Sequence, residues 1–146
     1  MQRAIVQEFL PRFSREAEVL YIGDTAKRVL CRNDDQLKEL GFSELAHETL
    51  PDVVAYERDR NWLFLIEAVH SANPISKTRH LKLEELTKGC SVPRIYVSAF
   101  DDRKSFRKWI TEISWETEVW LVESPDHLSH FDGVKFLGPY EDGEGT

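Results

Sequence analysis

Two carboxylates stand at matching positions of a predicted β-hairpin. Residues 52–56 and 62–69 are rich in Val, Tyr, Trp and Phe, which favour strands, and the polar run ERDRN at 57–61 predicts the loop between them. If the hairpin closes symmetrically, the numbers of paired residues sum to 119, so Asp52 lies opposite Glu67. Directly opposed residues point to the same face of a sheet, with Cβ atoms about 4.5–5.5 Å apart. The spacing therefore predicts two neighbouring carboxylates at the open end of the hairpin.

Neighbouring carboxylates repel each other, and a bound cation relieves that repulsion. Mg²⁺ prefers hard oxygen ligands, so Asp52, Glu67 and the carbonyl of Ala68 are candidate metal ligands. In the alternative, Asp52 caps a strand and Glu67 ends one at the solvent, or a register shift of one residue separates them. The unbroken apolar run at 62–66 favours the metal site, because an acid that ends a buried strand needs a partner.

Longer motifs support the same interpretation. Pro51-Asp52 followed by Glu67-Ala68-Val69 resembles the PD-(D/E)xK nuclease motif, which is short and common by chance. A longer series, in the same order, resembles the BsuBI/PstI family of type II restriction endonucleases, and the likeness runs from about residue 4 to residue 139. The series consists of GDTA (23–26), LPDVV (50–54), NWLFLIEAV (61–69), WETEVW (115–120), HFDG (130–133) and FLGP (136–139).

The resemblance implies an activity, a fold and a set of partners. It implies Mg²⁺-dependent hydrolysis of phosphodiester bonds in double-stranded DNA, by a type II restriction endonuclease. The implied fold is α/β, with a mixed central β-sheet flanked by helices. Nucleases of this class often carry an acid on the first helix, which makes Glu8 a further candidate metal ligand. The relatives are considerably longer, so an N-terminal recognition domain absent from this chain and a homodimer are also among the expectations.

The third position of the nuclease motif departs from the pattern. It is normally Lys, but here it is Val69, which cannot orient a water or stabilise an oxyanion. In several branches of the superfamily a cation reaches the site from the following helix instead. Lys77 and Arg79, in the first turn of a helix predicted over 76–88, are therefore the candidate catalytic cations. Cations at a helix N-terminus cost about 0.3–1 kcal/mol each, which favours a functional role, although exposed charges there are often tolerated.

The remaining pattern predicts an alternation of helices and strands, consistent with the α/β class. The helix predicted over 101–115 carries Arg103, Lys104, Arg107 and Lys108 on one face, which is either a DNA-backbone contact or a solvated surface. The other predicted elements are a helix over 2–10 that Pro11 ends or kinks, strands 19–22 and 28–31, a helix over 34–40 between Asn33 or Asp34 and Gly41, and strands 94–100 and 118–122.

Size and composition set the broad class. A chain of 146 residues predicts one domain, here residues 1–140, with a flexible tail at 141–146. No apolar stretch approaches the roughly 20 residues of a membrane span, the N-terminus is unlike a signal peptide, and Cys31 and Cys90 lack metal spacing. We therefore expect a cytoplasmic protein with free thiols and no membrane contact. The five His lack zinc spacing, and Asp126, His127 and His130 are expected in a surface loop.

The net charge of −7 leaves alternatives open. Phosphate contacts supply most non-specific DNA affinity, so any basic surface of this chain must be clustered. The acidic balance and Val69 favour a catalytically inactive nuclease fold that serves as a DNA- or protein-binding module. The presence of both Asp52 and Glu67 favours an enzyme. Cleavage of single-stranded DNA or of RNA is a third alternative.

Overall fold

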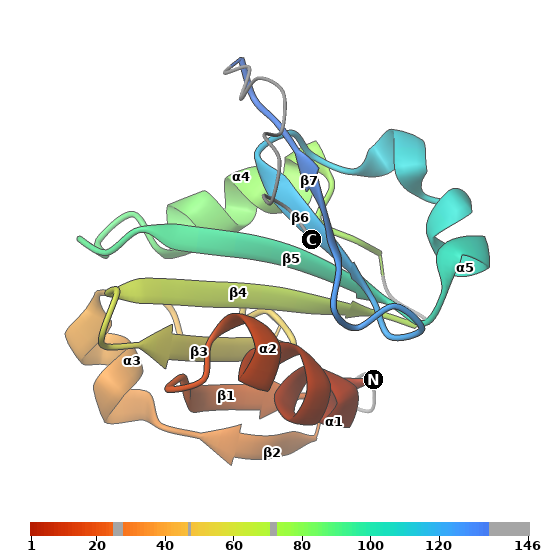
Figure 1. The fold of residues 1–146 in the computed structure, drawn as a ribbon. Coiled ribbons are helices and arrows are strands. Elements are labelled where there is room, and N and C mark those ends of the chain that lie inside the picture. The colour runs from red at the N-terminus through yellow and green to blue at the C-terminus, as the bar shows by residue number, and fades with distance from the viewer. Residues whose placement is uncertain (25–27, 47, 71–72, 135–146) are drawn as a thin grey trace.

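The computed structural model describes residues 1–24, 28–46, 48–70 and 73–134. Within these residues, seven strands form one sheet in the order β2-β1-β3-β4-β5-β6-β7 (Figure 1). The β4–β5 and β5–β6 pairs are parallel and the other pairs are antiparallel, which confirms the predicted mixed sheet. The strands are β1 (Glu18–Gly23), β2 (Val29–Arg32), β3 (Val53–Glu57), β4 (Trp62–Val69), β5 (Arg94–Phe100), β6 (Thr117–Leu121) and β7 (Leu128–Phe131).

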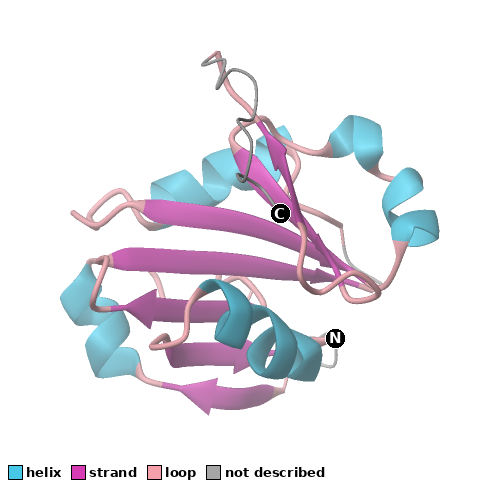
Figure 2. Cartoon of the chain, in the orientation of Figure 1, coloured by secondary structure: helices cyan, strands magenta, loops and turns pink. Residues whose placement is uncertain are grey.

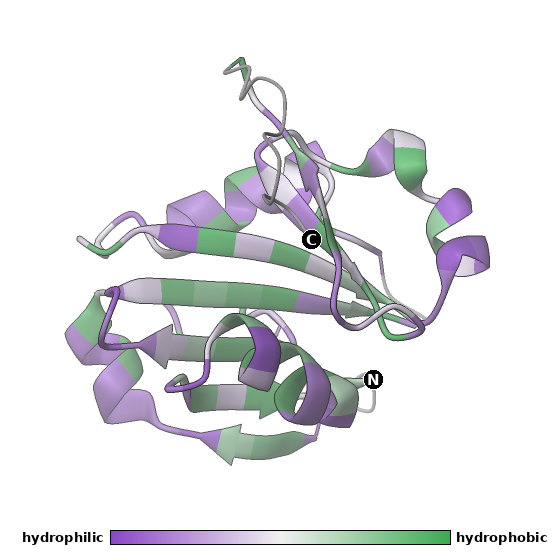
Figure 3. Cartoon of the chain, viewed as in Figure 1, coloured by the Kyte–Doolittle hydropathy of each residue, from purple (hydrophilic) through white to green (hydrophobic). Residues whose placement is uncertain are grey.

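Helices cover both faces of this sheet (Figure 2). On one face, Ile5 and Phe9 of the N-terminal helical segment pack on Phe64, Ile66 and other strand residues. On the opposite face, α3 and α4 pack on residues of β1, β3, β4 and β5. β4 is thus buried on both sides and is drawn largely in hydrophobic green in Figure 3. The helices are α1 (Gln2–Ala4), the π-helix η1 (Ile5–Phe9), α2 (Leu10–Phe13), α3 (Asp34–Leu40), α4 (Lys77–Leu86), α5 (Arg103–Arg107) and the 3₁₀-helix η2 (Ile110–Glu112).

The central hairpin has the register that the sequence predicts. Val53 pairs with Ile66, Val54 with Leu65, and Glu57 with Trp62, so the paired numbers sum to 119 throughout. The polar loop turns at Asn61, which adopts a positive φ of 60°. This confirms the register on which the expected meeting of Asp52 and Glu67 rests.

Helices α3 and α4 begin and end close to the predicted residues. The Asn33 side chain accepts a hydrogen bond from the Gln36 N–H and caps α3, which ends at Gly41. Gly41 has a φ of +112° and its Cα lies against the Gly89 carbonyl, where an added Cβ would come within 2.4 Å. A side chain at Gly41 is thus excluded both by conformation and by space. α4 is capped by Ser76, the first residue of the helix predicted over 76–88, but ends at Leu86, two residues before the predicted Lys88.

Pro11 does not end the first helix, although that is one of the two outcomes predicted for it. The helical segment continues through Pro11 to Phe13. Leu10 donates its N–H to the Ile5 carbonyl, a wide π-type turn that directly precedes the proline. Pro11 then occupies the first turn of α2, where a missing N–H is tolerated.

The C-terminal part departs from the expected elements in two ways. The helix predicted over 101–115 is the short α5 followed by η2, because Asp102 caps α5 and the β-branched Ile110, Thr111 and Ile113 disfavour helix continuation. Ile113 is extended and buried. His130 was expected in a surface loop but lies in the edge strand β7. The residues of β7 are mostly exposed and show no alternation of apolar and polar residues, so the sequence carries no strand pattern there.

Three of the expectations concern the chain as a whole. No helix among the described residues is long and apolar enough to cross a membrane. The tail predicted at 141–146 lies outside the described residues. The assignment of residues 1–140 to a single domain stays a prediction.

Candidate active site

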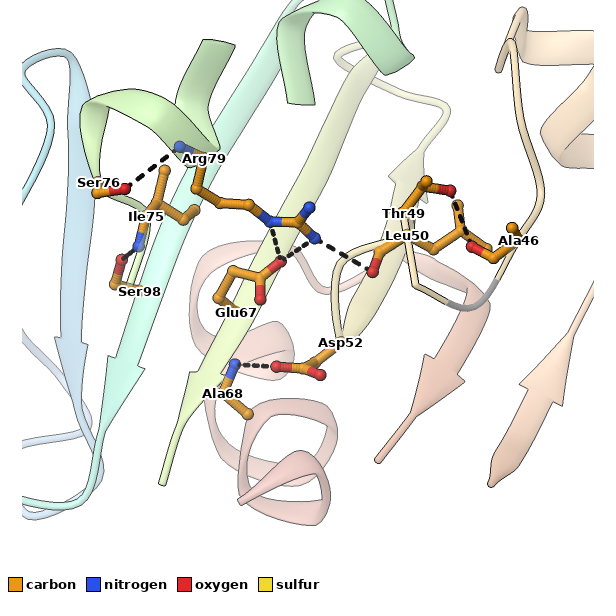
Figure 4. A network of polar contacts seen from close by, with 10 residues as sticks. All are labelled: Ala46, Thr49, Leu50, Asp52, Glu67, Ala68, Ile75, Ser76, Arg79 and Ser98. Atoms are coloured by element: carbon orange, nitrogen blue, oxygen red, sulfur yellow. Dashed lines mark hydrogen bonds and ion pairs between the residues drawn. The ribbon is translucent and has the colours of Figure 1, made fainter. Parts of the chain in front are cut away.

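The ends of β3 and β4 bring Asp52 and Glu67 to one place (Figure 4). Asp52 immediately precedes β3, and Glu67 is the sixth residue of β4, one position beyond the last β3 pair. Val54 and Leu65, two residues from each carboxylate, both belong to the cluster under α3 and α4. Because side chains alternate along a strand, both carboxylates lie on this same face of the sheet.

Glu67 is buried and pairs with a cation from α4. Its exposed fraction is 7%. Arg79 donates from Nη2 and Nε to Glu67 Oε1, at 2.9 Å and 3.3 Å, and Nη2 also reaches the Leu50 carbonyl at 3.3 Å. Burial raises the pKa of Glu67 to about 7, with Arg79 opposing the rise and the Asp52 charge adding to it. A carboxyl group with a pKa this far above its usual range is typical of functional sites.

Asp52 is held by the backbone of the opposite strand. Its Oδ2 accepts a hydrogen bond of 2.7 Å from the Ala68 N–H, and its own carbonyl accepts one from the Gly23 N–H. In a strand, the N–H and C=O of one residue point to the same side. The Ala68 carbonyl therefore faces the same side of β4 as Asp52.

The position of Arg79 depends on how α4 is anchored. Ser76 caps the helix by accepting from the Arg79 N–H at 3.2 Å, which fixes the turn that carries the arginine. One residue later, the buried His80 contacts Ser114 Oγ at 2.7 Å through Nδ1 and Glu84 Oε1 at 3.0 Å through Nε2. The Ser114 N–H donates to the Ile75 carbonyl. These bonds tie the start of α4 to the segment that precedes β6.

The structure brings Arg79 to the two carboxylates, but it places the other candidates elsewhere. Lys77 lines a separate hollow together with Glu84 and Trp115. Glu8 lies on the helical segment that covers the opposite face of the sheet, and its Oε2 pairs with Arg12 Nη1 at 2.7 Å. Among the described residues, no group of three or more His, Cys, Asp or Glu side chains is arranged to hold a metal.

A further cation, Lys82, lies beside Glu67 and was not among the residues predicted from the sequence. Lys82 lines the same hollow of about 490 Å³ as Glu67 and Arg79. It follows Arg79 by three residues on α4, so both side chains project from one side of the helix. The three-residue spacing between Arg79 and Lys82 is therefore the feature of the sequence that points to Lys82.

A family model for the BsuBI/PstI restriction endonuclease domain matches residues 1–134. The chain belongs to this family. It is 42% identical over 139 residues to the type II restriction enzyme BsuBI of Bacillus subtilis, covering 95% of this chain and 44% of that enzyme. It is 32% identical over 142 residues to the type II restriction enzyme AplI of Arthrospira platensis (strain NIES-39 / UTEX 3086 / IAM M-135), with 92% and 44% covered.

A solved structure extends the comparison to three dimensions. The chain matches the structure of the SdaI restriction endonuclease with a TM-score of 0.86 and 42% identity, over 96% of this chain and 44% of that one. The family and the restriction endonuclease-like fold that the motifs predicted are therefore confirmed. The chain spans less than half the length of these relatives.

Within this BsuBI/PstI family domain, Val69 has a structural role. It is 4% exposed and packs with Phe100, Ile113 and Val119. Val69 lies on the same face as Glu67, since the two are two residues apart on β4. The motif position that usually carries Lys is thus part of the apolar packing beneath α5, and Arg79 and Lys82 are the cations that line the hollow beside Glu67.

The donor set of this family domain fits a hard divalent cation. Asp52 and Glu67 offer carboxylate oxygens (Figure 4). The Ala68 carbonyl faces the same side of β4 as the Ala68 N–H that Asp52 accepts from. Mg²⁺ is commonly bound by one or two carboxylates, with waters and substrate phosphates completing the shell. Burial of Glu67, and to a lesser degree the nearby Asp52 charge, raises the pKa of Glu67, and a cation placed between the two carboxylates would offset both effects.

Proposed function

We propose that this chain is the catalytic domain of a type II restriction endonuclease that hydrolyses phosphodiester bonds of double-stranded DNA with Mg²⁺. The observation that carries the proposal is that Asp52, Glu67 and Arg79 lie together at one end of β3 and β4, two inner strands of a restriction endonuclease-like sheet. The matched relatives are restriction enzymes by name, which supports the same reaction class.

Each residue of the site has a role in the proposed reaction. Asp52, Glu67 and the Ala68 carbonyl would hold the cation. When bound, Mg²⁺ supplies charge neutralisation at the phosphoryl oxygens and lowers the pKa of a nucleophilic water. Arg79 fixes the orientation of Glu67 and places a positive charge beside the reacting phosphate, where negative charge develops in the transition state. Lys82, on the rim of the same hollow, adds a second cation at the approach to the site.

The length comparison bears on the partners of the whole enzyme. Because the chain spans 44% of each matched relative, we expect sequence recognition to need a further domain. A homodimer that cuts both strands of the duplex is expected from the family resemblance alone. Both expectations belong to the complete enzyme rather than to the residues of this site.

Cleavage of supercoiled plasmid DNA by this chain tests the proposal. We expect nicked or linear product with Mg²⁺ and none with EDTA. Asp52→Asn and Glu67→Gln should each abolish cleavage. Their matched controls, Asp35→Asn and Glu39→Gln, change exposed acids of the same types on α3 and should cut normally.

The opposite results would reject the proposal. Cleavage that survives both active-site substitutions would place the chemistry elsewhere. A folded chain that binds DNA but never cuts it with Mg²⁺ would support the inactive binding module instead.

A further inference from the structure

Four neighbouring cations at the C-terminal end of β5 have no role in the site described above. Arg103, Lys104, Arg107 and Lys108 are all exposed, on and just after α5. None of them forms a salt bridge with another described residue, whereas most other arginines of the described chain do. α5 shows purple, hydrophilic turns in Figure 3. In a chain with a net charge of −7, four unpaired cations within six residues form a local positive surface.

The acids near this surface make hydrogen bonds to other groups and form no salt bridge with its four cations among the described residues. Asp101 contacts His70 Nδ1 at 3.2 Å, and Asp102 accepts from the Ser105 N–H at 2.8 Å. Hydrogen bonds from Ser105, with a smaller effect of the Lys104 and Lys108 charges, lower the pKa of Asp102. Glu123 accepts from the backbone N–H of Arg103 at 2.9 Å. The cationic side chains are therefore left facing solvent, where a polyanion can reach them.

The positive surface lies at the same end of β4 and β5, and on the same face of the sheet, as the two carboxylates. β4 and β5 are parallel, with Glu67 beside Ser98 and Val69 beside Phe100, so α5 begins where these strands end (Figure 1). Phe106 of α5 packs against the cluster that contains Val69 and Phe100. Val69 lies on the Glu67 face, so α5 covers that same face. A duplex with one phosphate at Glu67 would therefore extend along the side of the molecule that carries α5.

The shape beside α5 also suits a nucleic-acid backbone. A hollow of about 380 Å³ separates α5 from β6 and β7. Arg103, Arg107 and His127 line it together with the apolar side chains of Phe106, Leu121 and Leu128. Guanidinium groups bind phosphate oxygens through paired hydrogen bonds, and apolar side chains accept the deoxyribose face.

We propose that Arg103, Lys104, Arg107 and Lys108 bind phosphates of the DNA duplex that flanks the Asp52/Glu67 site. This surface contacts the backbone and reads no sequence, so it raises affinity equally for every duplex. The inference rests on the proposed function for its choice of DNA as the polyanion, but its test measures binding and not cleavage.

The test compares two double variants of equal charge. Arg103→Gln with Arg107→Gln removes two cations of the α5 surface. Lys38→Gln with Arg58→Gln removes two exposed cations, one on α3 and one at the β3–β4 loop, at the opposite end of the sheet from Asp52 and Glu67. Binding of a fluorescein-labelled 30-base-pair duplex is followed by anisotropy in EDTA, from low to physiological KCl.

The expected result is a change in salt dependence for the α5 variant alone. Each phosphate contact contributes about 0.9 to the slope of log Kd against log [KCl], so the slope should fall by about 2. The loss of affinity should be the same for duplexes of different sequence. Thermal unfolding should match the unsubstituted chain, because neither arginine has an ion-pair partner among the described residues.

Two results would overturn the inference. One is an unchanged slope in the α5 variant, and the other is an equal change in both variants, which would reflect net charge alone. Failure of the proposed function is distinguishable, since a chain that never cuts plasmid DNA could still show the α5-specific slope. It would then be a DNA-binding module that uses this surface.

Discussion

At the residue scale, the site combines a buried carboxyl group with the cation that offsets its charge. Glu67 stays buried because it continues the apolar strand β4, and Arg79 reaches it from the first turn of α4. Burial destabilises the charged form of Glu67. The proposed role of Glu67 as a charged metal ligand and the folding stability of the chain therefore oppose each other at this position.

This opposition predicts a specific pH dependence of stability. The folded-state pKa of Glu67, about 7, lies above the unfolded value of 4.5. The folded protein therefore holds this proton more tightly, so the contribution of Glu67 to the free energy of unfolding is largest below pH 4.5 and falls as the pH rises to about 7. Glu67→Gln should remove that fall and be more stable than the unsubstituted chain above pH 7 by up to about 3 kcal/mol. Urea unfolding at a series of pH values in EDTA measures the difference, and parallel curves would contradict the prediction.

Metal binding should depend on both carboxylates. Calorimetry with Mg²⁺ or Mn²⁺ should show binding that Asp52→Asn and Glu67→Gln each abolish, because a pair of hard oxygen ligands is lost when either is changed. Glu8→Gln should bind the metal normally, since Glu8 pairs with Arg12 on the opposite face of the sheet. Loss of binding in Glu8→Gln would show that this acid joins the site when metal is present.

Arg79 and Lys77, the two α4 cations predicted from the sequence, should contribute differently to DNA cleavage. Arg79→Ala should reduce plasmid cleavage by about 10²–10³-fold, the range for loss of one donor to a developing anion. Lys77→Ala serves as the control, since Lys77 lines a different hollow, and it should cut at the unsubstituted rate. The prediction fails if the Arg79 variant cleaves normally or if both variants lose activity equally.

At the element scale, short polar contacts hold the central hairpin against the N-terminal helix. Glu57 at the end of β3 accepts from Ser14 Oγ at 2.6 Å and from Arg60 at 2.5 Å, and Arg60 also donates to the Phe13 carbonyl at 2.8 Å. The Arg60 guanidinium lies 3.8 Å from the centre of the Trp62 ring. This network closes the end of the hairpin that lies away from Asp52, and so supports the register that brings the two carboxylates together.

The network predicts a pH dependence of opposite sign to that of Glu67. Hydrogen bonds from Arg60 lower the pKa of Glu57 to about 2, below the unfolded value of 4.5. The stabilisation that ionised Glu57 gives the folded state is therefore present above pH 4.5 and is lost as the pH falls toward 2. At pH 7, Glu57→Gln should destabilise the fold by about 1.5–3 kcal/mol, the usual worth of hydrogen bonds to a charged group. Thermal unfolding at pH 7 and pH 3 checks this, with a smaller difference expected at pH 3.

At the scale of the whole molecule, an acidic chain carries a cluster of four exposed cations on and just after α5. With a net charge of −7 and less than half the length of its relatives, this chain should bind DNA weakly and with steep salt dependence. Anisotropy with duplexes of several sequences should show little selectivity between them. Tight, sequence-selective binding at physiological salt would instead show that the recognition elements lie within these residues.

The sequence by itself determined the hairpin and the two carboxylates, because register in a short hairpin depends on local strand propensity and loop length. It also determined the caps of α3 and α4, which are formed by neighbours in the chain. Only the tertiary structure decided which α4 cation reaches Glu67, since that depends on how the helix packs on the sheet and on the His80–Ser114 contact. Likewise β7 exists through its pairing with β6, and the 3₁₀-helix η2 ends where Ile113 enters the core. These are long-range contacts, whose pairing energy no local pattern of residues encodes.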